Sequence, residues 1–205
     1  MKRKEQARGP KDIPIVVDLD GTLIVNDLLI EGFFMMVQRE PLSIFLVPVW
    51  LWRGRAWFKE QIARRVSIDE KKLPYHRQFM AYLHKEFSDG RALILATASH
   101  KKYAQAIARY LGIFSEVIAS DEQHNLSGHS KLKVLLEKYG EKGFDYAGNS
   151  RVDLFIFPHA RDAILVGASR RVLSAAQKIS NVRMVFPRED ALPGGRQPES
   201  KEQPG

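Results

Sequence analysis

Two acidic residues, one position apart, stand directly after a short apolar run near the start of the chain. The run is Ile13–Val17, and the pentapeptide Asp18–Thr22 follows it. A continuous run rich in β-branched residues predicts a strand that is buried on both faces. Because side chains alternate along a strand, Asp18 and Asp20 are expected on one side, at its carboxyl end. Gly21 then lets the chain turn away, because glycine tolerates a positive φ.

Two carboxylates this close together are unfavourable unless a positive group lies between them or one keeps its proton. A metal ion or a phosphoryl group would meet that requirement. The carboxyl ends of strands in an open parallel sheet are also where such folds place their sites. The structural alternative is an acidic cap on a strand-to-helix turn, which needs only one Asp.

Two hydroxyl residues follow the second predicted strand, residues 92–96. Thr97 and Ser99 are two positions apart and share a side. A hydroxyl at a strand end can donate a hydrogen bond to a phosphoryl oxygen. Either residue, and Ser99 more readily, can instead serve only as the cap of the next helix.

A lysine lies in the first turn of a helix predicted over residues 130–139. A cation at this position opposes the helix dipole by about 0.3–1 kcal/mol when it is exposed. A bound phosphate would reverse that cost, so Lys131 is a candidate phosphate ligand. A solvated surface lysine is the structural alternative, and Lys133 competes for the same role; we favour Lys131.

Two further oxygen donors follow the fourth predicted strand, residues 144–147. Asn149 and Asp153 are four positions apart, which places them on one face of a helix start. Mg²⁺ binds carboxylates, carbonyls and waters. These two residues could therefore complete a site for a hard cation.

The elements that position these residues alternate along the chain. Besides those already named, strands are predicted at 116–119, 163–166 and 182–186, with helices at 75–87 and 103–111. This alternation predicts a parallel sheet covered on both faces. We expect a core of residues 12–24 and 75–186, a helical insertion at 25–74, a disordered basic head at 1–11 and a disordered tail at 187–205.

Composition narrows the function. The net charge of +8 favours anionic partners. There is no cysteine, which excludes disulfides, thiolate metal sites and a cysteine nucleophile, and agrees with a cytoplasmic location. The chain has no stretch of about 18 uninterrupted apolar residues, so no membrane span is predicted. No recognised nucleic-acid-binding module is present, so a nucleic-acid partner is not expected.

The 25–74 insertion differs in character from the rest. All three tryptophans lie in it, at Trp50, Trp52 and Trp57, and several Arg and Lys residues stand beside them. Tryptophan next to cations is typical of an element at a membrane interface. The alternative is a small helical cap whose apolar faces pack on each other and on the core.

Together, these patterns resemble the haloacid dehalogenase superfamily of aspartyl phosphatases. The resemblance is carried by Asp18–Thr22, by Thr97 after the second strand, by Lys131, and by the segment 148–153. It implies an α/β fold, namely a three-layer αβα Rossmannoid core with a parallel sheet of five or six strands. A small helical cap would be inserted after the first strand.

The resemblance also implies a role for each residue. Asp18 would be the nucleophile that becomes an aspartyl phosphate, and Asp20 the general acid and base. Thr97 and Lys131 would neutralise the phosphoryl oxygens. The family commonly has an acid where Asn149 stands, a departure that removes one negative charge. The predicted Mg²⁺ ligands are Asp18, Asp20, Asn149 and Asp153, and the predicted substrate contacts are Gly21, Thr22 and Ser99.

Within the superfamily, the chain resembles phosphatase-like domains found at the N-terminus of membrane prenyltransferases that use polyprenyl phosphates. This implies a lipid-linked or isoprenoid phosphate as substrate, a separate membrane prenyltransferase as partner, and peripheral contact with the inner membrane face. Two alternatives stay open. One is a soluble phosphatase for a small phosphorylated metabolite, and the other is a catalytically weak regulatory module for a membrane enzyme.

Overall fold

The computed structural model describes residues 12–121 and 125–189. Its centre is one sheet of six parallel strands in the order β3-β2-β1-β4-β5-β6. The strands are β1 (Ile15–Val17), β2 (Leu93–His100), β3 (Glu116–Ser120), β4 (Asp145–Gly148), β5 (Ala163–Val166) and β6 (Val182–Phe186). The predicted α/β class with a parallel sheet is therefore confirmed, with the larger of the two expected strand numbers.

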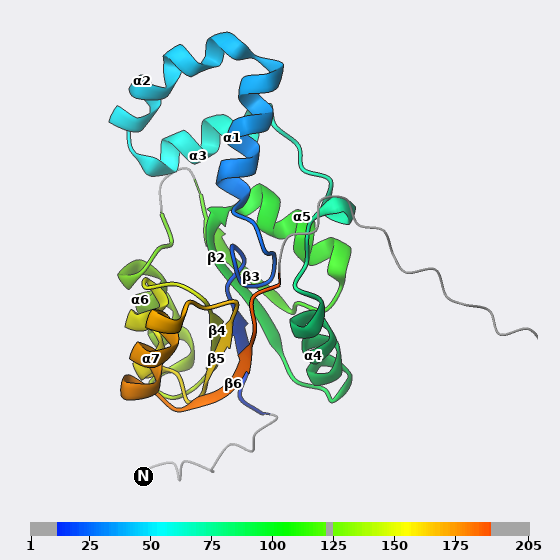
Figure 1. The fold of residues 1–205 in the computed structure, drawn as a ribbon, viewed down its shortest axis with the longest axis vertical. Coiled ribbons are helices and arrows are strands. Elements are labelled where there is room, and N and C mark those ends of the chain that lie inside the picture. The colour runs from blue at the N-terminus through cyan, green and yellow to red at the C-terminus, as the bar shows by residue number, and fades with distance from the viewer. Residues whose placement is uncertain (1–11, 122–124, 190–205) are drawn as a thin grey trace, which may run out of the picture.

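Helices cover both faces of this sheet (Figure 1). One layer holds α4 (Arg77–Ser88) and α5 (Lys101–Leu111), and the other holds α6 (His129–Tyr139) and α7 (Arg170–Ile179). Strand β1 shows how both faces of the sheet are buried. Ile15 and Val17 pack into the cluster under α4 and α5, whereas Val16 packs into the cluster under α6 and α7. Helix α7 was not predicted from the sequence.

The inserted segment forms a helical cap above the sheet (Figure 1). It contains α1 (Leu28–Arg39), the 3₁₀ turn η2 (Pro41–Leu46), α2 (Val47–Trp52), α3 (Arg55–Arg65) and the 3₁₀ turn η3 (Glu70–Lys72). The chain enters and leaves the cap side by side. The Val25 amide donates to Pro74 O at 2.9 Å, and the His76 amide donates to Leu23 O at 3.0 Å.

The cap has its own small core. Met36, Trp50, Ile62 and Val66 are buried together, and Phe33, Trp57 and Phe58 pack against them. Cap helices therefore pack on one another, as one of the two sequence-based alternatives expected. The cap also packs on the main domain, since the Lys102 ammonium donates to Ala63 O at 2.6 Å.

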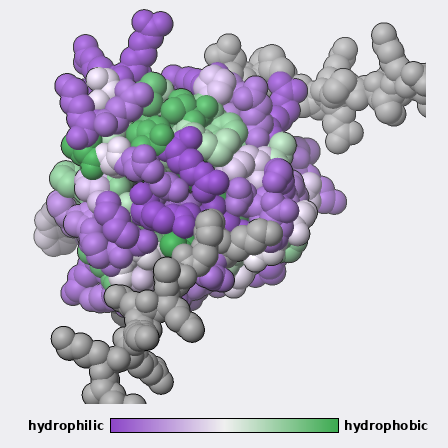
Figure 2. Space-filling view, turned by 90° about the horizontal axis from the view of Figure 1, so that it is seen from below, coloured by the Kyte–Doolittle hydropathy of each residue, from purple (hydrophilic) through white to green (hydrophobic). Residues whose placement is uncertain are grey.

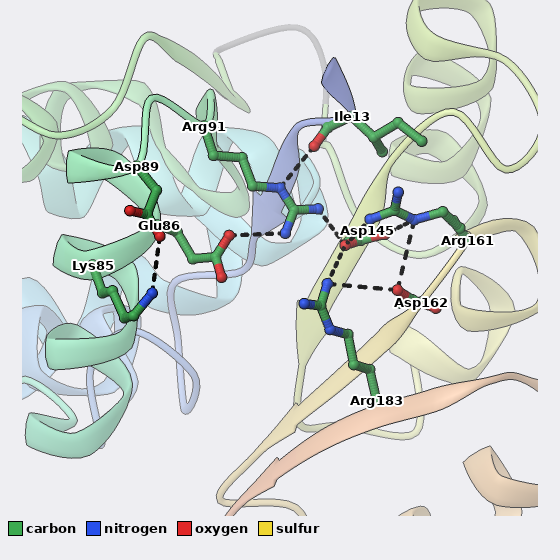
Figure 3. A network of polar contacts seen from close by, with 9 residues as sticks. All are labelled: Ile13, Lys85, Glu86, Asp89, Arg91, Asp145, Arg161, Asp162 and Arg183. Atoms are coloured by element: carbon green, nitrogen blue, oxygen red, sulfur yellow. Dashed lines mark hydrogen bonds and ion pairs between the residues drawn. The ribbon is translucent and has the colours of Figure 1, made fainter. Parts of the chain in front are cut away.

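An arginine cluster closes the opposite, amino end of the sheet (Figure 3). Asp145, the first residue of β4, is fully buried and accepts from Arg161 Nε at 2.9 Å and Arg161 Nη2 at 2.8 Å. Arg91 Nη2 donates to the same carboxylate, and Arg91 Nε donates to Ile13 O at 2.8 Å. This cluster joins the start of β4 to the segments before β1, β2 and β5.

The prediction of a disordered tail from residue 187 onward does not hold for residues 187–189. The ring Nε2 of His76 donates to Pro187 O at 2.8 Å. The Glu189 carboxylate accepts from the amides of Arg77 at 2.9 Å and Gln78 at 3.2 Å, which are the first two residues of α4. Residues 187–189 are thus bound to the core, because an acidic side chain satisfies free amides at a helix start. The rest of the predicted tail, 190–205, and the predicted head, 1–11, lie outside the described residues.

Candidate active site

The predicted site residues gather at the carboxyl end of β1. This strand lies between β2 and β4, where the chain order of the sheet reverses, and ligands bind at such a point in open parallel sheets. A pocket of about 500 Å³ opens here between the sheet and the cap. Core residues supply its floor: Asp18, Asp20, Ser99, Lys131, Asn149 and Asp153.

A chain of hydrogen bonds links Asp18 to Asp153 through the buried Lys131. Its ammonium donates to Asp18 Oδ1 at 2.6 Å and to the Tyr146 hydroxyl at 3.1 Å. The Tyr146 hydroxyl in turn donates to Asp153 Oδ1 at 2.8 Å. Lys133 is exposed, and its Nζ lies 3.9 Å from Glu137 Oε1. Of the two lysines that the sequence left in competition, only Lys131 therefore reaches the site.

Asp20 is held between the core and the cap. Its Oδ2 accepts from Ser99 Oγ at 2.5 Å and lies 3.5 Å from Thr97 Oγ1. Its Oδ1 accepts from the amide of Leu28 at 2.9 Å, the first residue of α1. A displacement of the cap would therefore alter the hydrogen bonding of Asp20 directly.

The two hydroxyls after the second strand have different positions. Ser99 lines the pocket, whereas Thr97 is fully buried and its Oγ1 accepts from the Ser99 amide at 2.9 Å. Strand β2 continues to His100, and the His100 ring caps α5 by accepting from the Lys102 amide. The alternative that Ser99 is only a helix cap is therefore wrong.

Gly21 and Thr22 also differ. Gly21 has the expected positive φ, +72°, and its carbonyl accepts from Asn149 Nδ2 at 2.9 Å. A Cβ at Gly21 would lie 2.1 Å from that nitrogen, so a substitution there would displace the Asn149 side chain and strain the backbone. Thr22 is fully buried and does not line the pocket; within the described part of the chain, its hydroxyl has no hydrogen-bond partner. The structure does not bring Thr22 to the site, and Gly21 also does not line the pocket.

Asp153 is fixed by the turn that follows β4. Its Oδ2 accepts from the amides of Asn149 at 3.1 Å and Ser150 at 2.8 Å, and from Ser150 Oγ at 2.7 Å. The expected helix start is this turn followed by the 3₁₀ turns η4 (Asp153–Phe155) and η5 (Phe157–His159). The side-chain amide of Asn149 donates a hydrogen bond to Gly21 O, which a carboxylate at this position could not do.

Burial determines the electrostatics of the floor. It raises the pKa of Asp18 to about 7, with Lys131 acting in the opposite direction and Asp153 adding to the rise. It also raises the pKa of Asp20, against the hydrogen bond from Ser99. Burial lowers the pKa of Lys131, but Asp18 and Asp153 outweigh it and the net shift is upward. The floor therefore contains more negative charge than its one lysine can neutralise.

These donors suit a hard cation. Within residues 12–121 and 125–189, no three His, Cys, Asp or Glu side chains form a metal cluster on their own. The oxygens available are the carboxylates of Asp18 and Asp153, with Asn149 beside them. Mg²⁺ accepts such a set, because it binds through one or two carboxylates and keeps several waters. The raised pKa of Asp18 indicates that another positive charge would stabilise this arrangement.

Lys59 and Tyr146 were not predicted as site residues. Lys59 and Arg55 were grouped instead with the Arg and Lys residues beside the cap tryptophans. Lys59 Nζ in fact donates to Ala98 O at 2.6 Å and to Asn125 Oδ1 at 2.7 Å, and both cations line the pocket. Tyr146 left a weak signal, a hydroxyl within the fourth predicted strand. Nothing in the local pattern distinguished Lys59 from its neighbours.

The chain belongs to the haloacid dehalogenase-like hydrolase family, whose pattern matches residues 15–157. It is 37% identical over 158 residues to the uncharacterized protein y4nM of Sinorhizobium fredii (strain NBRC 101917 / NGR234). That match covers 77% of this chain but only 30% of y4nM, so the chain spans less than a third of the relative. The predicted family and its hydrolase class are therefore confirmed.

Solved structures share the fold. A protein of unknown function from Bordetella pertussis Tohama I is similar with a TM-score of 0.65 and 15% identity, over 86% of this chain and 98% of that one. A substrate-bound phosphoserine phosphatase is similar with a TM-score of 0.59 and 12% identity, over 88% and 96%. At these identities, the similarity establishes the common architecture.

Proposed function

We propose that this hydrolase is a Mg²⁺-dependent phosphomonoesterase that acts through an aspartyl-phosphate intermediate on a lipid-linked or isoprenoid phosphate. The observation that carries the proposal is the contact of Lys131 with Asp18 at the end of the central strand. This lysine holds a partly buried carboxylate that lines the pocket, with a second acid, Asp20, close by. A nucleophile and an acid–base group in one pocket are what transfer of a phosphoryl group requires.

In the first step, an Asp18 carboxylate oxygen attacks phosphorus and the bond from phosphorus to the leaving oxygen breaks. Asp20 gives its proton to that oxygen, a role that the upward shift of the pKa of its partly buried carboxyl favours. In the second step, water attacks phosphorus and Asp20 takes the proton. The bond from phosphorus to Asp18 breaks, which releases inorganic phosphate and restores both carboxyl groups.

Other side chains stabilise the charge on the transferred group. Lys131 and the hydroxyl of Ser99 face the pocket, where they can balance the phosphoryl oxygens. Thr97 is buried below the floor and positions Ser99 and Asp20, because its hydroxyl accepts from the Ser99 amide and lies 3.5 Å from Asp20 Oδ2. Asp18, Asp153 and Asn149 would hold Mg²⁺, which supplies the positive charge that the floor lacks.

The walls of the pocket favour an amphiphilic substrate. Above the charged floor, the lining includes Leu29, Leu51 and Phe58 from the cap and Val152 from the core. Leu51 is also half exposed, so the apolar wall continues to the molecular surface. A phosphate ester with an apolar tail could place the phosphate on the floor and the tail along this wall.

A small phosphorylated metabolite is the second candidate. Arg55 and Lys59 line the same pocket and could pair with a carboxylate of such a substrate. The phosphoserine phosphatase fold agrees with this alternative as far as architecture goes.

Phosphate release from geranyl phosphate and from O-phosphoserine distinguishes the two candidates. We expect turnover that needs Mg²⁺ and stops with chelator, with kcat/KM about tenfold or more higher for geranyl phosphate. A preference for O-phosphoserine would favour the second candidate. Absence of turnover of both, with Mg²⁺ present, would contradict the proposed activity.

A further inference from the structure

An uncharged and largely exposed stretch covers the outer end of the cap. Residues 41–52, which form η2 and α2, contain no charged residue. Seven large apolar side chains of this stretch are exposed, and we call them the cap apolar surface: Leu42, Ile44, Phe45, Leu46, Val49, Leu51 and Trp52. The most exposed are Trp52 at 88%, Leu42 at 78% and Phe45 at 76%.

This concentration is specific to the cap. Of the fifteen exposed large apolar residues in the described part of the chain, nine lie in the cap, since Ile30 and Phe34 of α1 add to the seven. The other six are spread over α4, α5, α7, β6 and the turn at η4. Seen from the opposite end, the molecule is mostly hydrophilic, with some hydrophobic areas (Figure 2). A large apolar patch on one end of a water-soluble fold indicates an interaction site.

Cations border the cap apolar surface. Between residues 39 and 59 the chain has four cations, Arg39, Arg53, Arg55 and Lys59, and one acid, Glu40. Arg39 and Arg53 are exposed at the two ends of the uncharged stretch. An apolar face rimmed by arginine and carrying an exposed tryptophan complements an anionic lipid surface, where rings enter the headgroup layer and cations meet phosphates.

We infer that the cap apolar surface docks the protein on an anionic membrane. In Figure 1, η2 and α2 lie at the end of the molecule farthest from the sheet, so this contact leaves the core in water. Leu51 belongs to both the cap apolar surface and the pocket wall, so docking brings the pocket entrance to the lipid. The inference deepens the proposed substrate class but does not need the chemistry of Asp18.

The structure also corrects which tryptophan makes the contact. The sequence-based expectation gave all three tryptophans this role. Trp50 is buried in the cap core with 6% exposure, and the Arg65 guanidinium stacks on it. Trp57 is half-buried, and Arg53 stacks on it at 4.7 Å. Only Trp52 is free to enter a lipid interface, so replacing Trp50 would damage the cap rather than test docking.

Co-sedimentation of the full chain with vesicles tests the inference. We expect binding to phosphatidylcholine vesicles that contain phosphatidylglycerol at low salt, and much less to pure phosphatidylcholine. A Leu42→Ser, Phe45→Ser, Trp52→Ser triple variant should bind about tenfold or more weakly. Replacing Arg39 and Arg53 with Gln should weaken binding about fivefold for each charge. Phe87→Ser, an exposed apolar residue of α4, is the matched control and should bind normally.

Two further readouts separate docking from misfolding and from catalysis. Binding should shift Trp52 fluorescence to the blue, and Trp52→Phe should lose the shift but keep the sedimentation. Asp18→Asn should bind vesicles as the native chain does, whether or not the native chain hydrolyses phosphate esters. Equal binding of the native chain and a triple variant with native circular dichroism would overturn the inference. So would absence of binding to anionic vesicles, or a native dimer in solution that the triple variant abolishes.

Discussion

Two aspartates at opposite ends of the sheet have opposite electrostatic surroundings. Asp145, where β4 begins, contacts the guanidinium groups of Arg91 and Arg161. A third guanidinium, that of Arg183, lies 3.8 Å away. Asp18, just after β1, contacts one ammonium, that of Lys131, whose charge also acts on Asp153. One carboxylate is surrounded by cations, and the other shares a single cation.

The difference separates a structural cluster from a reactive one. The acids and arginines of the Asp145 cluster neutralise one another in place, so this cluster can join segments of the chain permanently. At Asp18, burial and neighbouring acids raise the pKa of the carboxyl group to about 7. A carboxylate that its own surroundings do not neutralise is suited to accept a phosphoryl group or a cation. The same substitution in the two clusters should therefore have different effects.

Asp18→Asn should give the largest effect on activity. An amide cannot form the aspartyl phosphate, so phosphate release should fall by about 10³-fold or more. Stability at pH 7 should change little, because the substitution removes the cost of a desolvated carboxylate but also takes one of two acidic partners from buried Lys131, which keeps Asp153. Phosphate release and urea denaturation measure the two quantities. Lys133→Ala is the control and should leave both unchanged; residual activity within tenfold of the native value would exclude Asp18 as nucleophile.

Asp145→Asn should give the reverse pattern. The substitution removes the charge that Arg91 and Arg161 share and leaves buried Arg91 only Glu86 as a carboxylate partner, which should lower the free energy of unfolding by about 3–5 kcal/mol. The turnover of the folded enzyme should change little, because the cluster lies at the far end of the sheet from the pocket. Urea denaturation gives the first quantity and phosphate release at low temperature gives the second. A loss of activity without a loss of stability would contradict the structural role.

Gly148→Ala should disturb the reactive cluster through its support. A Cβ at this end of β4 would lie 2.7 Å from Asp153 Cγ and 2.9 Å from Tyr146 Cε1. Displacing Asp153 should raise the Mg²⁺ concentration for half-maximal activity about tenfold. The crowding should also cost about 1–3 kcal/mol of stability. Titration of activity with Mg²⁺ checks this, and an unchanged midpoint would remove Asp153 from the metal ligands.

The last prediction concerns the pH dependence of stability in the presence of chelator. Because the folded pKa of Asp18 is about 7 and its ordinary value is 3.8, the folded state binds a proton more tightly than the unfolded state. Stability contributed by this proton is complete below the ordinary value and is lost as pH rises towards 7. Asp18→Asn lacks this proton, so its stability relative to the native chain should increase from pH 4 to 7 and then level off. A constant difference would argue against the raised pKa.

Much of the fold follows from the sequence. Apolar runs with turn residues between them predicted every strand. For the inner strands the reason is burial on both faces, which needs nearly continuous apolar residues, whereas the edge strands β3 and β6 are only partly buried. The same logic placed Asp18, Asp20 and the Thr97–Ser99 pair at strand ends. Helix α7 was not predicted, although Ser169 caps it. The Ser169 Oγ accepts from the Val172 amide at 3.3 Å.

The sequence by itself determined the order of the elements and the residues at the strand ends, since backbone periodicity is local and repeats in every strand. Only the tertiary structure decided which side chains meet. It selected Lys131 over Lys133, buried Thr22 and Trp50, brought Lys59 into the pocket and attached Glu189 to α4. Each of these outcomes depends on a partner from a distant segment or on burial by several elements. Local patterns contain no record of such contacts, because packing alone creates them.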